Sequence, residues 1–189
     1  AAVYGGKIQL FGRAYRGGPT SRKAMRMKAA QAFVFGEQLG WIDPSVINDP
    51  VNGAFLRRLA RLRSRLLPFL ATGRMLRPPR IITEVPDITA DWRWHGTWPV
   101  TIKAVQTGAW EDLSGNFVLL FVNVRGEKQS FEVDFSGSLP QSEDSYAICE
   151  TVTEAGTKKW DGKEKGYLLT LELGPFDAKA FLGRKKQEQ

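Results

Sequence analysis

Four side chains near the start of the chain could bind or transform a small polar molecule: Arg13, Tyr15, Glu37 and Trp41. Glu37 offers a carboxylate, which can act as a general acid, a general base or a nucleophile. Arg13 and Tyr15 offer hydrogen-bond donors, and Trp41 offers a flat apolar face. Each also has a structural alternative: an ion pair of Glu37 with a nearby arginine, anchoring of a loop by Arg13 and Tyr15, and packing of Trp41 against a helix.

Two strand-then-helix units are predicted to position these side chains. The alternation in Lys7–Phe11 predicts a short strand, and the apolar run Phe33–Phe35 predicts a brief buried strand that ends at Gly36. Strong helix formers extend from Arg22 to about Gln31. A longer helix is predicted from about Asn52 to Ala71 because its apolar residues recur at three- and four-residue spacing. These apolar residues are Phe55, Leu56, Leu59, Leu62, Leu66 and Leu70.

The order strand, helix, strand, helix is typical of an α/β fold with parallel strands. Two such units cannot close a parallel sheet, and a complete (β/α)8 barrel takes about 250 residues. We therefore predict that residues 1–80 are the last two βα units of a barrel whose earlier part lies outside this chain. In a barrel, functional side chains lie at the carboxyl ends of the strands, which selects Gly12–Tyr15 and Glu37–Trp41.

Beyond Ile81 the helical period disappears, and residues 81–185 are predicted to form an antiparallel β-sandwich. Turn residues separate the predicted strands, which are Val100–Val105, Phe117–Val124, Ser130–Phe135, Tyr146–Val152 and Tyr167–Leu173. The run Phe117–Val122 contains no polar residue, which predicts a central strand. Residues 186–189 are predicted to be a frayed polar tail.

The net charge of +7 is unevenly distributed along the chain. Residues 1–80 contain 15 Lys and Arg against three acidic residues, a net charge of +12, whereas residues 81–189 carry −5. The basic run Arg57–Arg65 lies on the predicted leucine helix. We interpret it as the charged outer side of that helix, paired in part with acidic groups elsewhere in the protein. A nucleic-acid binder is the weaker alternative, and we expect no nucleic-acid partner.

Composition argues against several further classes of protein. The longest apolar run has six residues, far below the roughly 20 of a membrane helix, so we expect no membrane partner. Cys149 is the only cysteine and His95 the only histidine, which excludes an intrachain disulfide and sites rich in cysteine or histidine. We expect neither a metal nor another cofactor.

The string Phe33–Trp41, followed by the Leu/Arg helix and the segment Ala71–Pro79, resembles the end of the catalytic barrel in a group of poorly characterised bacterial glycoside-hydrolase-like proteins. Gly115–Val124 and Gly174–Phe181 are similar to strands of the small C-terminal β-sandwich that follows this barrel. The resemblance covers nearly the whole chain, and Gly36–Trp41 is its most specific part. It implies an enzyme acting on carbohydrate, most of whose barrel precedes this chain.

On this resemblance, Glu37 would be the catalytic carboxylate, with a second carboxylate upstream because glycosidases commonly use two. Arg13, Tyr15 and Trp41 would bind the sugar. The predicted function is that of a glycoside-hydrolase fragment that is inactive by itself. A carbohydrate-binding or structural β-sandwich module without catalytic activity is the alternative.

The most aromatic stretch of the chain contains Trp92, Trp94 and Trp98, with His95 between them. Period-two spacing places Trp92 and Trp94 on one side of an extended segment. We predict that this stretch forms the seam between the sandwich and the βα units. A carbohydrate platform on the sandwich is the alternative.

Overall fold

The computed structural model describes residues 3–8, 10–11, 13–93, 96–140, 146–162 and 164–185. The helices are η1 (Pro19–Ser21), α1 (Arg22–Val34), α2 (Pro44–Asn48), α3 (Pro50–Arg65), α4 (Leu67–Leu70) and η2 (Ser136–Ser138). The strands are β1 (Arg74–Leu76), β2 (Arg80–Ile81), β3 (Asp87–Arg93), β4 (Thr97–Lys103), β5 (Val105–Glu111), β6 (Phe117–Asn123), β7 (Gln129–Asp134), β8 (Tyr146–Val152), β9 (Thr157–Lys159), β10 (Glu164–Lys165), β11 (Leu168–Leu173) and β12 (Ala178–Lys185). The predictions for Trp94, His95 and residues 186–189 fall outside the described residues.

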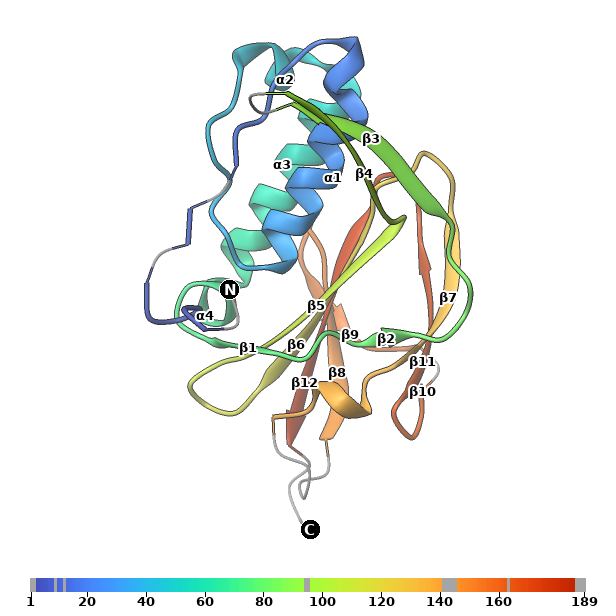
Figure 1. Ribbon diagram of the computed structural model, residues 1–189. Coiled ribbons are helices and arrows are strands. Elements are labelled where there is room, and N and C mark those ends of the chain that lie inside the picture. Colours follow the sequence, from blue (N-terminus) through green and yellow to red (C-terminus); the bar gives the residue numbers. More distant parts are fainter. Residues whose placement is uncertain are drawn as a thin grey trace.

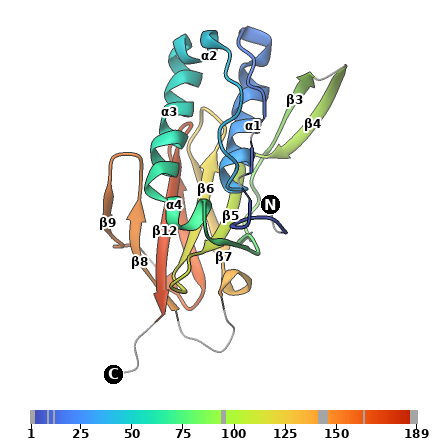
Figure 2. The same ribbon diagram turned by 90° about the vertical axis from the view of Figure 1, so that its left-hand side faces the viewer.

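The chain combines helices with antiparallel sheets, arranged in layers (Figure 1). One sheet has six strands in the order β1-β5-β6-β12-β8-β9, and the other has four in the order β10-β11-β7-β2. Helices α1 and α3 lie against the six-stranded sheet, on the side away from the four-stranded sheet. The hairpin β3–β4 forms a separate two-stranded sheet beside α1 (Figure 2).

Strand β6 lies inside the six-stranded sheet, between β5 and β12, and all of its residues are buried. Its side chains alternate between two apolar cores. Val118, Leu120 and Val122 pack with the helices, while Phe117, Leu119 and Phe121 pack with the four-stranded sheet. Both faces of the strand are therefore covered, which is why its sequence has no polar face. The predicted central strand is confirmed.

The predicted strand–helix–strand order is present with parallel pairing, at shifted positions. Two isolated parallel bridges join Phe11 to Gln38 and Tyr15 to Ile42, with α1 as the connection between them. We call residues 10–11, 13–15 and 38–42 the parallel pair. In Figure 1 these extended segments run on the opposite side of α1 and α3 from the sheets.

The predicted strand Phe33–Phe35 is wrong, because α1 continues to Val34. The backbone N–H groups of Gly36 and Glu37 donate to the carbonyls of Phe33 and Ala32 at 3.0 and 2.9 Å, and Gly36 has a φ of +70°. This is the Schellman ending of a helix, which favours glycine in the left-handed conformation. An apolar run before a glycine suits either a strand end or a helix end, and the sequence pattern does not separate them.

Two other boundaries in the first part of the chain also differ from the prediction. The N–H groups of Lys7 and Ile8 donate to the carbonyl of Tyr4 at 3.0 and 3.2 Å, so these residues lie in a turn and the pairing begins only near Phe11. The long helix is interrupted at Leu66, since Pro68 has no N–H to donate one turn back. All six residues of its predicted apolar stripe are buried.

The antiparallel region begins earlier than expected and contains strands that the pattern missed. Strand β1 pairs with β5 from Arg74 onward, and the predicted strand Val100–Val105 is divided between β4 and β5. Strand β5 contains Gly108, where an added Cβ would lie 2.7 Å from the carbonyl oxygen of Val34. The close approach of β5 to α1 therefore requires a glycine at position 108. A glycine inside a strand weakens the sequence pattern by which the strand would be predicted. The division of the chain into 1–80 and 81–185 stays a prediction.

Helices and sheets are joined by specific polar contacts as well as by apolar packing. The indole N–H of Trp110, which is fully buried in β5, donates to the carbonyl of Val34 at 3.0 Å. Arg58 of α3 pairs with Glu154 at 2.9 Å and also donates to the carbonyl of Phe176. Arg61 lies 3.9 Å from the same carboxylate. Pairing of the basic run with distant acidic groups is confirmed for these two arginines.

Candidate functional site

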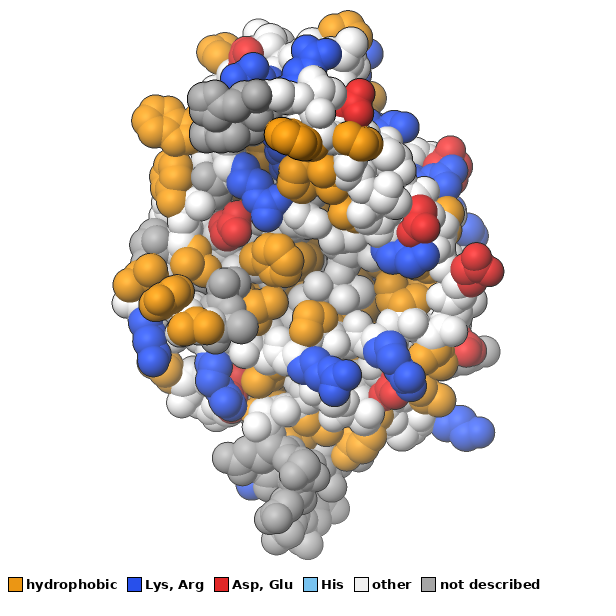
Figure 3. All heavy atoms as spheres, in the orientation of Figure 1, with side chains coloured by type: hydrophobic (Ala, Val, Ile, Leu, Met, Phe, Trp, Pro, Cys, Tyr) orange, Lys and Arg blue, Asp and Glu red, His pale blue; other side chains and the backbone are white. Residues whose placement is uncertain are grey.

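A hollow of about 540 Å³ lies between residues 13–16, the flank of α1 and the hairpin β3–β4. We call it the tryptophan hollow. Its lining residues are Arg13, Ala14, Arg16, Lys28, Trp41, Trp92, Arg93, Trp98 and Val100. Figure 3 shows basic side chains next to hydrophobic ones in the upper part of this face, over α1 and the hairpin. The hollow thus combines flat apolar faces with cations.

Two cations from different parts of the chain lie close to the ring of Trp92. The guanidinium carbon of Arg13 lies 5.3 Å from the ring centroid, and the ammonium nitrogen of Lys28 lies 5.4 Å from it. Both distances are within the range of cation–π attraction. Trp92 of β3 is also directly opposite Trp98 of β4 in the hairpin. These contacts position one wall of the hollow relative to α1.

The two other tryptophans of the hollow are more exposed than Trp92. Trp41 is 74% exposed and Trp98 is 59% exposed, whereas Trp92 packs against the core formed with the helices. Trp92 therefore lies where the hairpin packs against the core formed with the helices. The predicted seam between the sandwich and the βα units stays a prediction. The centre of the interface between helices and six-stranded sheet is instead Trp110, which the sequence prediction did not single out.

The basic side chains of the hollow are largely without acidic partners. In the part of the chain that the structure describes, no carboxylate lies within 4.0 Å of Arg16, Lys28 or Arg93. Burial lowers the pKa of the half-buried Lys28, and the positive charges of Arg13 and Arg16 lower it further. The hollow therefore concentrates positive charge that the described residues do not neutralise.

Arg13 links the hollow to a second group of polar side chains. Its Nη1 donates to Oε1 of Gln31 at 2.7 Å, and its Nε lies 3.9 Å from Oε2 of Glu37. Oε2 of Glu37 and the hydroxyl of Tyr15 are buried without a hydrogen-bond partner among the described residues. Burial raises the pKa of Tyr15, and the charge of Glu37 adds to this effect while Arg13 opposes it. We call Arg13, Tyr15 and Glu37 the Glu37 cluster.

The four residues singled out in the sequence are thus close together but do not all reach the hollow. Arg13 and Trp41 line it, whereas Tyr15 is 1% exposed and, like Glu37, is not among the lining residues. Glu37 precedes the second segment of the parallel pair instead of following a strand. Its catalytic role stays a prediction.

Sequence reasoning missed three basic residues of the hollow: Arg16, Lys28 and Arg93. Arg16 directly follows Tyr15, so the rule that selects carboxyl ends of strands would have found it had the segment been extended by one residue. Lys28 lies on a helix and Arg93 on a hairpin strand. No local pattern connects these two residues with Trp41, because only the packing of the hairpin beside α1 brings them together.

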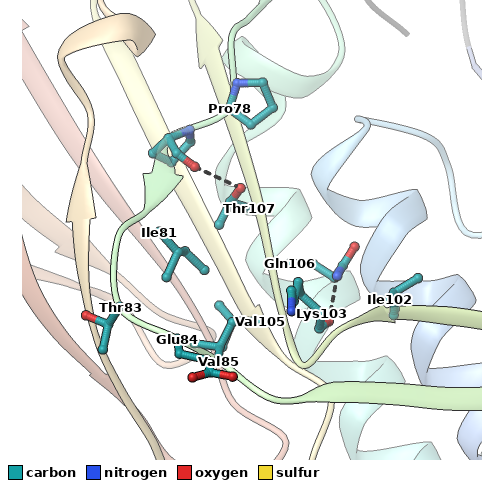
Figure 4. Close-up of a pocket in the computed structure, with 11 residues that line it drawn as sticks. Pro78, Ile81, Thr83, Glu84, Val85, Ile102, Lys103, Val105, Gln106 and Thr107 are labelled. Atoms are coloured by element: carbon teal, nitrogen blue, oxygen red, sulfur yellow. Dashed lines mark hydrogen bonds between the residues drawn. The ribbon is translucent and has the colours of Figure 1, made fainter.

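A second hollow, of about 480 Å³, lies where the chain enters β3 and where β4 turns into β5 (Figure 4). Most of its polar side chains are already engaged. Nε2 of Gln106 donates to the carbonyl of Lys103 at 2.7 Å, and Oγ1 of Thr107 donates to the carbonyl of Pro79 at 3.2 Å. Lys103 in turn pairs with Asp87 at 2.8 Å. The tryptophan hollow offers more unengaged polar groups and is the better candidate site.

Neither a metal-binding cluster nor a membrane-spanning helix is found among the described residues. Over these residues, no three His, Cys, Asp or Glu side chains come together in a way that could hold a metal ion. None of the helices there has the length and apolar character needed to cross a membrane.

Solved structures that resemble this chain are glycoside hydrolases. An α-amylase from Geobacillus thermoleovorans, complexed with acarbose, aligns with 88% of this chain at 14% identity and a TM-score of 0.49. A family 30 subfamily 8 xylanase from Clostridium acetobutylicum aligns with 93% at 7% identity and a TM-score of 0.47. A family 27 β-L-arabinopyranosidase from Geobacillus stearothermophilus aligns with 95% at 13% identity and a TM-score of 0.40.

The chain spans only 34%, 42% and 36% of the lengths of these three proteins, respectively. No protein-family model matches the chain, and no curated protein matches it significantly.

Proposed function

We propose that this chain is the C-terminal part of a glycoside hydrolase. In this proposal the parallel pair supplies the last two strands of a (β/α)8 barrel, and the two antiparallel sheets are the appended β-sandwich. The observation that supports it best is the position of the tryptophan hollow. The hollow is lined by Arg13, Ala14, Arg16 and Trp41 near the carboxyl ends of the parallel pair, and barrel enzymes bind substrate at that end of their strands.

The chemistry of the hollow suits a sugar. Tryptophan faces pack against the C–H groups of a pyranose ring, and guanidinium groups donate hydrogen bonds to its oxygens. A volume of about 540 Å³ is within the range of small-molecule sites. Arg13 and Trp41 are proposed to contact the sugar. Glu37 is proposed as the catalytic carboxylate, with Tyr15 beside it.

The exposed side of the parallel pair supports the idea that further strands belong next to it. Phe11 of the parallel pair is more than half exposed, and so are Val3, Tyr4 and Ile8, which come just before it in the chain. The rings of Phe11 and Trp41 pack edge to face at 6.2 Å and cover each other only in part. Exposed apolar side chains grouped in this way mark a surface that another protein part covers. In the proposal, the earlier βα units of the barrel cover it.

Saccharide titration of the 189-residue chain tests this proposal. We expect isothermal titration calorimetry to detect binding of at least one disaccharide from a set of galactobiose, xylobiose and digalacturonate. Trp41→Ala should weaken this binding about tenfold, because the sugar loses its stacking face. Leu113→Ala removes an equally exposed apolar side chain from the turn between β5 and β6 and should leave the affinity unchanged. Absence of binding, or equal losses in the two variants, would contradict the proposal.

A further inference from the structure

The tryptophan hollow holds more positive charge than recognition of a neutral sugar requires. Its lining contains four basic side chains and no acidic one. Of the nearby carboxylates, Glu37 faces Arg13 at 3.9 Å. Asp91 lines a smaller adjoining hollow that shares Arg16, Lys28 and Arg93 with the larger one. Neither carboxylate lies on the wall that a ligand in the larger hollow would touch.

Three of the four cations are available to a ligand. Arg13 is already bonded to Gln31 and close to Glu37, whereas Arg16, Lys28 and Arg93 have no ion pair with any residue that the structure describes. Lys28 is half-buried, and Arg16 and Arg93 are exposed. Like charges placed close together repel one another, and an anion among them offsets that repulsion. The pKa of Lys28 is lowered mainly by burial, and the charges of Arg13 and Arg16 lower it further. The positive charge of the hollow therefore favours an anionic ligand.

We propose that the tryptophan hollow binds a sugar ring carrying an anionic substituent, a carboxylate or a sulfate ester, held by Arg16, Lys28 and Arg93 while Trp41 and Trp98 pack against the ring. This inference rests on the proposed function and narrows its substrate class to acidic saccharides. The planar guanidinium groups match the oxygens of a carboxylate or a sulfate in pairs, and the lysine adds a compact charge. The aromatic walls supply the preference for a sugar over a free inorganic anion.

The arrangement of charge distinguishes this ligand from a nucleic acid. The hollow is bounded by α1 on one side and by the hairpin on the other, with room for one or two rings. A duplex would instead need a row of exposed cations along a surface. The densest basic run of the chain does not provide that row, because Arg58 and Arg63 are engaged with Glu154 and the carbonyl of Gly36.

Calorimetry on the 189-residue chain with matched disaccharides tests the inference. The probes are galactobiose, digalacturonate and a galactobiose sulfate ester, so the charged group differs while the rings stay similar. We expect at least one acidic probe to bind about tenfold or more tightly than galactobiose at low salt. That advantage should shrink as salt is raised, because the contact is ionic. Comparison of digalacturonate with the sulfate ester identifies which anionic substituent the site accepts.

Charge-removing variants test whether the hollow is responsible. Lys28→Met and Arg16→Gln should each weaken binding of the acidic probe about tenfold and weaken binding of galactobiose by a clearly smaller factor. Lys158→Met is the matched control, since this exposed lysine of β9 loses the same charge far along the chain from the hollow. Circular dichroism confirms that each variant is folded. The use of two variants keeps the test decisive if one of them fails to fold.

Each other outcome overturns the inference, and one of them leaves the proposed function intact. Equal affinity for galactobiose and both acidic probes would remove the anionic preference while a saccharide site remains. Binding of none of the probes would overturn both proposals. If Lys158→Met lost as much affinity for the acidic probe as Lys28→Met, the net charge of the protein alone would attract the probe. Tighter binding of a duplex DNA oligonucleotide than of the acidic disaccharides would show a nucleic-acid surface instead.

Discussion

Glu37 illustrates how the same side chain can satisfy either a structural or a catalytic interpretation. Its side chain is 19% exposed, it lies 3.9 Å from Arg13, and its Oε2 has no hydrogen-bond partner among the described residues. A purely structural carboxylate is normally satisfied by close hydrogen bonds. A catalytic one often keeps an oxygen free until the substrate arrives.

We expect Glu37→Gln to separate these interpretations in a longer protein that carries the preceding βα units. A carboxamide has almost the same shape as a carboxylate, but it cannot act as a general acid or base. We therefore expect kcat to fall about 100-fold or more. The free energy of unfolding should change by less than about 1 kcal/mol, because the ion pair lost is a long one. Steady-state kinetics and urea denaturation measure the two quantities.

Asp43→Asn is the matched control for this substitution. Asp43 caps α2 through the N–H of Ser45, and an asparagine oxygen can accept the same bond. Its kcat should stay near that of the unmodified protein. A near-normal kcat in Glu37→Gln would remove Glu37 from the catalytic set and leave it the structural role.

At the scale of elements, the end of α1 is the place where the helix, the six-stranded sheet and the parallel pair meet. Gly36 reverses the chain there, and the carbonyl of Val34 receives the indole N–H of Trp110 at 3.0 Å. The same turn leads into the second segment of the parallel pair. One residue in the left-handed conformation therefore connects the helix, the sheet and the lining of the candidate site.

Gly36→Ala should destabilise the protein by about 2–3 kcal/mol. The new Cβ would lie 2.6 Å from Cζ2 of the Trp110 ring, and the φ of +70° is strained for alanine. Gly115→Ala is the control, because its φ of +79° carries similar strain but nothing lies within 4 Å of the added Cβ. It should cost about 1 kcal/mol. Equal losses in urea denaturation would show that the contact with Trp110 is unimportant.

Elements with a strict pattern were predictable, and elements shaped by close contacts were not. The bounds of β8 agree with the predicted Tyr146–Val152, and β7 and β11 agree to within one residue at each end. Strand β5 was largely missed because Gly108 makes room for α1 instead of following an alternating pattern. A residue chosen for what lies opposite it in space carries little local signal.

At the scale of the whole molecule, the helices and the six-stranded sheet share one core. A single cluster of buried side chains extends from Tyr15 through the helices to Ala180 of β12. Without α1 and α3, the side chains of β5 and β6 that now pack against these helices would face water. The boundary near residue 80, visible in the charge distribution, is therefore not a boundary of packing.

This shared core predicts a single cooperative unfolding transition for the 189-residue chain. Far-UV circular dichroism at 222 nm follows the helices, and near-UV dichroism follows the buried tryptophan Trp110. We expect the two thermal curves to coincide, because loss of the helices exposes the sheet. Trp110→Phe should shift the midpoint measured at 222 nm downward. Separate midpoints would show that residues 1–80 and 81–185 unfold as independent units.

The sequence by itself determined the layered α/β character, the parallel strand–helix–strand order, the central position of β6 and the candidate residues Arg13 and Trp41. Each of these depends on hydrophobic periodicity or on residue types near each other in the chain. Only the tertiary structure decided that Lys28 and Arg93 join them around one hollow, and that Glu37 and Tyr15 lie behind it. The reason is physical: the hollow exists because a hairpin about 60 residues further along packs beside α1, and no local pattern encodes that contact.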